Sequence, residues 1–147
     1  MELTDGNVTL RTPTDEDATA VAAGVQESLQ SLQLWMPWAT EDYDEAAARE
    51  WIHGIIEPSS IRFVITDPSG RIVGSTGLNS IDTLNARANL GYWLRDDATG
   101  FGYATGATRL VADYGLTELG LHRLEVLMSV ENEASRRVAI RATGPPP

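Results

Sequence analysis

Hydrophobic residues recur at helical spacing in two segments of the N-terminal part of the chain. Across residues 18–32 they lie three or four positions apart, which is the spacing of one buried helix face. Thr14 precedes this segment as a helix cap, and the acidic residues after it favour a helix start. Pro37 interrupts the pattern, and a second helix is expected to begin near Asp44 and to stop before Pro58.

The middle of the chain changes to the composition and spacing of strands. Residues 8–12 form a first short run, and residues 61–66 and 72–78 form two longer runs joined by the turn residues 67–70. A further run at residues 88–94 follows a polar connection. These runs predict a sheet that contains an antiparallel hairpin.

A helix, a strand and a last short helix are expected to follow. Apolar residues at helical spacing predict a helix over residues 103–119, which Gly120 ends. Residues 123–130 alternate in the manner of a strand, and residues 133–142 are expected to form a helix capped by Asn132. The resulting order, β-α-α-β-β-β-α-β-α, predicts a mixed α/β fold with one sheet.

Length and composition limit the classes of protein to which the chain can belong. Of its 147 residues 42% are hydrophobic, so residues 1–147 are expected to form a single domain. The absence of cysteine excludes disulfides, a thiolate nucleophile and cysteine zinc sites, and His53 and His122 are too few for a histidine-rich metal site. The polar N-terminus and the lack of a long apolar run predict a cytoplasmic protein without signal peptide, membrane span or metal.

Acidic residues outnumber basic ones, 21 to 11, which gives a formal net charge of −10. This charge disfavours nucleic acid as a partner, because phosphate backbones bind to basic surfaces. It suits a basic or amine-bearing partner, although solubility alone explains it equally well.

The most specific chemical signal is a glycine-rich turn between a strand and a helix. The strand that contains residues 91–95 is followed by Thr99, and Gly100 and Gly102 flank a single residue before the helix starts. Glycines keep side chains away from such a turn, so that backbone N–H groups can point at an anion. The positive end of the helix dipole adds to this attraction, and the turn therefore predicts a phosphate-binding cradle.

Five motifs, in order along nearly the whole chain, point to a known family. They are Leu34-Trp35-Met36-Pro37-Trp38, Gly91-Tyr92-Trp93-Leu94, Gly100-Phe101-Gly102-Tyr103-Ala104-Thr105, Leu119-Gly120-Leu121-His122-Arg123-Leu124-Glu125 and Asn132-Glu133-Ala134-Ser135-Arg136-Arg137-Val138-Ala139. With these motifs the chain resembles the GNAT acyltransferase superfamily and, within it, the RimJ/RimL-type protein N-acetyltransferases.

This resemblance implies a single mixed, mainly antiparallel sheet flanked by helices, and acetyl-CoA as the co-substrate. In the family, the glycine turn holds the pyrophosphate of acetyl-CoA, and the pantetheine arm lies along the preceding strand. The acceptor amine attacks the thioester directly, so no nucleophilic side chain is needed. The residues implied to contact acetyl-CoA are Trp93, Leu94, Arg95, Thr99, Gly100, Phe101, Gly102, Tyr103, Ala104, Thr105 and Asn132.

The same resemblance implies residues for proton transfer. Ser135 matches the family position of a proton donor for the leaving thiolate. Asn132 matches a family residue that contacts the pantetheine arm. A polar first-turn residue and a helix cap are the alternative interpretations of these two. Family members often have a glutamate base at the position of Asn89, whose amide cannot take a proton. Glu125 on the next strand is the nearest substitute, with a solvated surface carboxylate as the alternative interpretation.

The tryptophans near the first two helices have two interpretations. In the family this region walls the acceptor groove, so Trp35 and Trp38 are candidate substrate contacts. Core packing is the alternative, and it is the favoured interpretation for Trp51 on an apolar helix face.

Two features depart from the family pattern. Thr99 and Phe101 stand where polar or basic side chains usually assist pyrophosphate binding, and Arg95 is the candidate replacement. The family continues past the last helix into a closing strand pair, whereas this sequence reads Pro145-Pro146-Pro147. The fold is therefore expected to be C-terminally shortened, with an open sheet edge that could pair two copies into a homodimer.

The function expected from these residues is transfer of the acetyl group of acetyl-CoA to a primary amine. A protein N-terminal α-amine, basic in character, is the first choice of acceptor. Acetylation of a small amine or antibiotic is one alternative. The other is a CoA-binding domain, or a fragment, in which shortening has impaired catalysis.

Overall fold

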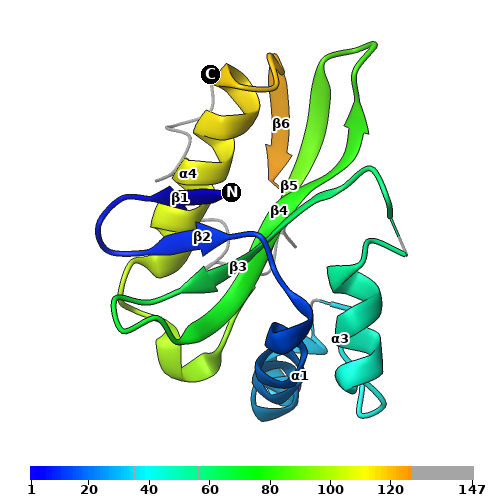
Figure 1. The fold of residues 1–147 in the computed structure, drawn as a ribbon, viewed down its shortest axis with the longest axis vertical. Coiled ribbons are helices and arrows are strands. Elements are labelled where there is room, and N and C mark those ends of the chain that lie inside the picture. Colours follow the sequence, from blue (N-terminus) through cyan, green and yellow to red (C-terminus); the bar gives the residue numbers. More distant parts are fainter. Residues whose placement is uncertain (35, 56, 127–147) are drawn as a thin grey trace.

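The computed structural model describes residues 1–34, 36–55 and 57–126, and at its centre lies a six-stranded sheet (Figure 1). The strands lie side by side in the order of the sequence. They are β1 (Glu2–Thr4), β2 (Thr9–Arg11), β3 (Ile61–Thr66), β4 (Ile72–Asp82), β5 (Arg87–Leu94) and β6 (Arg123–Val126). The predicted mixed α/β fold with one sheet is confirmed for this part of the chain.

Strands β1 to β5 pair antiparallel with their neighbours, whereas β6 runs parallel to β5. The recorded pairs between β5 and β6 extend from Arg87↔Arg123 to Leu90↔Val126, and the second half of β5 lies beyond them. The strand expected over residues 123–130 agrees as far as Val126, and its remainder lies outside the described residues. The sheet is therefore mainly antiparallel, as the family resemblance implied.

Helices cover both faces of this sheet. The helices α1 (Ala18–Glu27), α2 (Leu29–Leu32) and α3 (Glu45–Ile52) lie on one face, and α4 (Tyr103–Thr117) lies on the other (Figure 1). Two short 3₁₀ helices, η1 (Asp15–Asp17) and η2 (Asp96–Ala98), precede α1 and α4.

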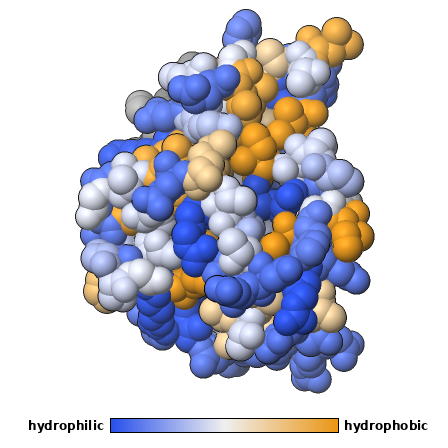
Figure 2. Space-filling model, in the orientation of Figure 1, coloured by the Kyte–Doolittle hydropathy of each residue, from blue (hydrophilic) through white to orange (hydrophobic). Residues whose placement is uncertain are grey.

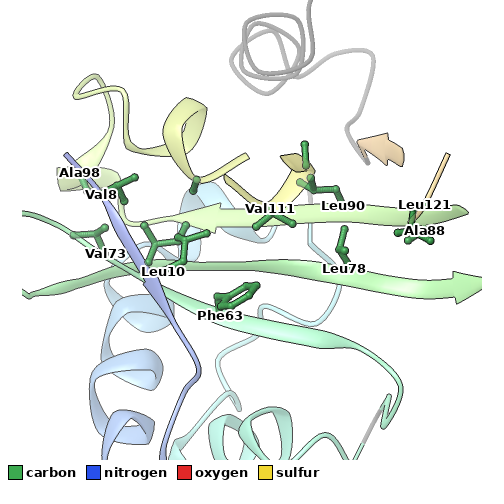
Figure 3. Packing of buried hydrophobic residues seen from close by; sticks show 13 residues of the cluster. Val8, Leu10, Phe63, Val73, Leu78, Ala88, Leu90, Ala98, Val111 and Leu121 are labelled. Atoms are coloured by element: carbon green, nitrogen blue, oxygen red, sulfur yellow. The ribbon is translucent and has the colours of Figure 1, made fainter. Parts of the chain in front are cut away.

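Two hydrophobic clusters fill the space between the sheet and these helices. Because successive strand residues point to opposite faces, Ile65 belongs to the cluster under α4 and Val64 to the cluster under α1 and α3. Figure 3 shows the first cluster, which includes Val8, Leu10, Phe63, Val73, Leu78, Leu90 and Val111. The second cluster includes Val21, Val25, Ala48, Ile52 and Trp93.

The start of α3 follows directly from the sequence. Asp44 is its N-cap, and the Asp44 Oδ1 accepts a hydrogen bond from the backbone N–H of Ala47 at 2.9 Å. The helix ends at Ile52, several residues before Pro58, and Gly54 shortly after it has a φ of 69°. A left-handed glycine is a common way to end a helix.

The helix expected over residues 18–32 is divided at Ser28. The side chain of Ser28 is buried, and its Oγ accepts a hydrogen bond from the backbone N–H of Asp96 at 3.0 Å. This contact joins the break between α1 and α2 to η2, 68 positions further along the chain. A tertiary contact of this kind overrides the local helical pattern.

The expected N-terminal cap is present at η1, and an ion pair stabilises it. The Asp17 carboxylate accepts the backbone N–H of Thr14 at 2.8 Å and two guanidinium N–H groups of Arg11, each at 2.8 Å. The hydrogen bonds from Arg11, as the largest cause, hold the pKa of Asp17 below its ordinary value of 3.8. The resulting stabilisation is complete above that ordinary pKa and is lost as the pH falls through the lower pKa of the folded state.

We expect Asp17→Asn to lower the free energy of unfolding by about 2 kcal/mol at pH 7, because charge-assisted hydrogen bonds to a buried group are lost. As the pH falls below the ordinary pKa of 3.8, this difference in unfolding free energy should shrink. The Asp17 carboxyl is then protonated first in the unfolded state and, at lower pH, in the folded state. Urea unfolding of both proteins at pH 7 and pH 3 measures this. An equal difference at the two pH values would contradict the assigned role of the Asp17 charge.

The strand β1 was not expected from the sequence, because three residues are too few to show an alternating pattern. Its pairing with β2, from Glu2↔Arg11 to Thr4↔Thr9, creates a hairpin where a single strand was predicted. Within the described ranges no helix is both long enough and apolar enough to cross a membrane. Hydrophilic residues dominate the face seen in Figure 2, with hydrophobic patches mainly in its upper half.

Candidate functional site

The predicted glycine turn lies between η2 and α4 and is open to solvent. Gly100 and Gly102 have φ values of 88° and 79°, in the left-handed region that favours glycine. A Cβ added at either residue would meet no atom within 4 Å. The first N–H groups of α4, which begins at Tyr103, have no partner within the helix. The turn therefore presents backbone donors next to free space, as anion binding requires.

The loop between β1 and β2 supports this turn. The Asn7 Nδ2 donates a hydrogen bond to the carbonyl oxygen of Phe101 at 3.5 Å. Asn7 itself is held by Asp5, whose Oδ1 accepts the backbone N–H groups of Asn7 and Val8 at 2.9 and 2.8 Å. On the other side of the turn, the Thr99 Oγ1 donates to the carbonyl oxygen of Asp96 at 3.0 Å. These contacts fix the turn from both ends.

The guanidinium of Arg95, the expected replacement for the missing basic side chains, is engaged by two carboxylates. It forms ion pairs with Glu27 of α1 and with Asp97, and its side chain is 12% exposed. Asp97 also pairs with Arg71 at 2.8 Å. The hydrogen bond from Arg71, followed by that from Arg95, holds the pKa of Asp97 below its ordinary value. The structure thus places Arg95 in an internal charge network beside the turn.

The side chains at the end of β5 face the interior of the protein. Trp93 is 5% exposed and packs in the cluster under α1 and α3, where its ring lies 3.0 Å from a Cβ built on Gly24. Leu94 packs against the opposite cluster. A ligand along this part of β5 would therefore meet backbone rather than the side chains of Trp93 and Leu94. Gly91, two residues before Trp93, has no atom within 4 Å of an added Cβ, so the strand is open there.

A polar pocket of about 270 Å³ lies near the other end of β5. Asn89 and Glu125, which are register partners on β5 and β6, both line it. Their neighbours Leu90 and Val126 pack under α4, so alternation directs Asn89 and Glu125 to the face of α1 and α3. The Glu125 carboxylate pairs with Arg123 at 2.9 Å and is 47% exposed. The remaining lining residues are Ser80, Asp82, Arg87 and Ala88.

Ser80 and Asp82 were not expected in this pocket, because no local pattern marks them as site residues. The strand predicted to end at residue 78 continues as β4 to Asp82, with a register shift against β5 between Asn79 and Asp82. Ser80 has a positive φ of 49°, and its backbone N–H donates to the Glu57 carboxylate at 2.7 Å. This irregular extension of β4 brings both residues beside Asn89.

Trp38 lies in the connection between α2 and α3, and its side chain is 44% exposed. Its ring packs at 5.4 Å from the ring of Tyr43, and burial raises the pKa of Tyr43 to about 12. Gln26 of α1 anchors this connection, because its Nε2 donates to the carbonyl oxygens of Thr40 and Tyr43 at 3.1 and 2.7 Å. Trp51 packs against the core cluster, in agreement with the interpretation favoured for it.

Several predicted site residues lie outside the described residues. They are Trp35, Asn132 and Ser135, together with the region where the closing strands were considered. Among the described residues, the structure brings Thr99, Gly100, Phe101, Gly102, Tyr103, Ala104 and Thr105 together in one turn and helix start. It places Glu125 at the opposite end of β5, and Trp38 on the helical connection.

Comparison with known proteins decides the family. The model of the acetyltransferase (GNAT) domain matches residues 7–143. The chain belongs to this family. The match covers the glycine turn and the strands β2 to β6, so the family assignment includes the part of the chain that forms the candidate site.

The similar proteins are N-acetyltransferases by name. YdaF of Bacillus subtilis, named provisionally as a ribosomal N-acetyltransferase, is 28% identical over 92% of this chain and 76% of its own length. The spermidine N1-acetyltransferase of Escherichia coli is 31% identical over 98 residues. These residues are 65% of this chain and 52% of that enzyme. The structure of RimL, a ribosomal L7/L12 α-N-protein acetyltransferase in complex with coenzyme A, has a TM-score of 0.88 at 20% identity, covering 97% of this chain and 83% of that one.

These findings confirm the expected GNAT fold and the RimJ/RimL-type relationship. They also place the GNAT domain in a class of acetyl-CoA-dependent N-acyltransferases.

Proposed function

We propose that this GNAT domain binds acetyl-CoA at the turn from Thr99 to Thr105 and acetylates the α-amine of a protein N-terminus. One observation carries the proposal: β5 leads from the pocket of Asn89 and Glu125 to the open glycine turn. From Asn89 to Leu94 this strand extends about 17 Å, at about 3.4 Å per residue. An elongated substrate along β5 can therefore contact the turn with one end and the pocket with the other.

The residues of the turn fit a pyrophosphate group. Gly100 and Gly102 leave free space where other residues would carry a Cβ, and the N–H groups at the start of α4 border that space. Bound acetyl-CoA supplies an acetyl group activated as a thioester. The turn contributes position, because fixing one end of a long substrate aligns the other end with the acceptor. Asn132 is proposed to contact the pantetheine arm.

Glu125 is the proposed general base. It lines the pocket beside Asn89, and its half-exposed carboxylate has access to solvent that can carry a proton away. The ion pair with Arg123 holds the Glu125 carboxylate in place at the edge of the sheet. Ser135 is the proposed proton donor to the leaving thiolate.

We expect Glu125→Gln to lower kcat about 100-fold, because an amide cannot accept the proton of the amine. The Kd for acetyl-CoA should change little, because the contacts at the glycine turn are kept and glutamine has the size and shape of glutamate in the pocket. Steady-state kinetics and a binding titration on the same preparations measure the two effects. The matched control is Glu118→Gln, an exposed glutamate after α4, for which kcat should equal that of the wild type. An unchanged kcat in Glu125→Gln would remove Glu125 from the mechanism.

A protein N-terminus is favoured as the acceptor by the names of YdaF and RimL. The net charge of −10 also attracts a protonated amine over a distance. A small polyamine is the second candidate, because one relative is a spermidine acetyltransferase and the pocket contains the carboxylates of Asp82 and Glu125.

Release of free CoA in the presence of different amines tests the proposal. The chain has no cysteine, so a thiol reagent detects only the CoA produced. Peptides with free N-termini, the same peptides with blocked N-termini, and spermidine form the acceptor panel. The proposal predicts release with the free peptides alone, whereas faster release with spermidine would support the second candidate. Binding of acetyl-CoA without release for any amine would contradict an active transferase.

A further inference from the structure

An exposed aromatic pair stands in the glycine turn. Phe101 is 60% exposed although it is a large apolar residue. Its ring stacks on Tyr103, with ring centroids 5.4 Å apart and an angle of 19° between the planes. Tyr103 in turn packs against the core cluster under α4. In this pair Tyr103 is held against the core, and the ring of Phe101 is exposed to solvent.

The backbone holds Phe101 in this position. The residue lies between Gly100 and Gly102, both with positive φ, and its carbonyl oxygen accepts the hydrogen bond from Asn7. Neither glycine has an atom of a residue other than its chain neighbours within 4 Å of an added Cβ, so no other segment covers the turn on either side of Phe101. The two glycines and the hydrogen bond from Asn7 therefore hold Phe101 in the turn with its ring exposed.

The side-chain charges around the glycine turn do not favour binding of a nucleotide through its phosphates alone. Thr99 and Phe101 carry no charge, and Arg95 and Arg71 are both engaged by Asp97. The chain as a whole has a net charge of −10. A ligand with several phosphate charges therefore needs an additional, uncharged contact to bind here with useful affinity.

We propose that Phe101, supported by Tyr103, stacks against the adenine ring of acetyl-CoA. Aromatic rings stack on nucleobases without needing charge, and a purine is the flat aromatic part of acetyl-CoA nearest to its phosphates. Stacking then contributes affinity at the nucleotide end of the substrate, where, among the described residues, the nearby Arg71 and Arg95 are paired with carboxylates. The inference rests on the proposed function, because it assigns one part of the same substrate to this turn.

Two acetyl donors separate this contact from the rest of the site. Acetyl-CoA contains adenine, whereas S-acetyl-4′-phosphopantetheine keeps the thioester, the pantetheine arm and one phosphate. It lacks the second phosphate of the pyrophosphate and the 3′-phosphoadenosine, so the comparison rests on how Phe101→Ala changes the affinity for each donor and not on the absolute affinities. We expect Phe101→Ala to weaken binding of acetyl-CoA about tenfold, in line with the usual loss on removing one stacked ring. The same substitution should leave binding of S-acetyl-4′-phosphopantetheine unchanged. Phe101→Trp should retain the affinity for acetyl-CoA. In proton NMR spectra, the adenine H2 and H8 resonances of acetyl-CoA should shift upfield when it binds to this variant.

The controls distinguish the stack from other roles of Phe101. Phe101→Leu keeps an apolar side chain without an aromatic face and should lose affinity as alanine does. Leu84→Ala removes another exposed apolar side chain, 91% exposed in the hairpin between β4 and β5, and should bind acetyl-CoA like the wild type. Equal weakening of both donors by Phe101→Ala would show a purely structural role in the turn, and full affinity in Phe101→Leu would show a nonspecific apolar contact. Either result overturns the stacking. A wild-type chain that binds neither donor would instead overturn the proposed function itself.

Discussion

Gly102→Val is expected to weaken binding of acetyl-CoA by about 100-fold or more, equivalent to about 2.7 kcal/mol. Gly102 has a φ of 79°, and a β-branched residue is strained by that conformation. Its side chain would also project into the free space that borders the first N–H groups of α4. The substitution therefore distorts the proposed cradle and fills it. Equilibrium dialysis with labelled acetyl-CoA measures the loss.

Gly120→Val is the matched control for this prediction. Gly120 has a φ of 66° and no atom within 4 Å of an added Cβ, so valine meets the same backbone strain and the same open surroundings. It lies beyond the other end of α4, a helix of 15 residues and hence about 22 Å long. The control should bind acetyl-CoA like the wild type. If Gly102→Val binds as well as Gly120→Val, the glycine turn is not the pyrophosphate site.

The second large effect is expected for Trp93→Ala, which should lower the free energy of unfolding by about 3–5 kcal/mol. Trp93 is 5% exposed, and its indole fills the space between β5 and Gly24 of α1. Alanine would leave a cavity at the contact that joins the sheet to the helices. Urea unfolding followed by circular dichroism measures the change. A loss below about 1 kcal/mol would contradict the core role of the indole.

Trp38→Ala removes a side chain of the same type from an exposed place. Trp38 is 44% exposed and contacts the ring of Tyr43. Its replacement should therefore cost no more than about 1 kcal/mol of unfolding free energy. The difference in unfolding free energy between Trp93→Ala and Trp38→Ala therefore measures the effect of burial, because the same type of side chain is removed in both.

Local signals in the sequence predicted those parts of the fold that local interactions determine. The cap of α3 at Asp44 and the start of α4 after Gly102 needed only neighbouring residues, and both are confirmed. The break at Ser28 depends on the N–H of Asp96, which is far away in the sequence, so helical spacing could not reveal it. For the same reason the three-residue strand β1 was missed, because only its pairing with β2 defines it.

The candidate site shows the same division. The glycine turn was predictable because its conformation requires glycine at Gly100 and Gly102. The ion pair between Arg95 and Glu27 was not predictable, because Glu27 lies on α1, far before Arg95 in the sequence. The roles of Asn132 and Ser135 stay predictions, because both residues lie outside the described part of the chain.

Calorimetric titration of acetyl-CoA into the purified chain shows whether this GNAT domain holds acetyl-CoA at the turn after β5. We expect saturable one-to-one binding with a Kd in the micromolar range, which corresponds to a binding free energy of about −8 kcal/mol. A sample that unfolds cooperatively but gives no binding heat at several temperatures would contradict it. The GNAT fold would then be present without a working site for acetyl-CoA.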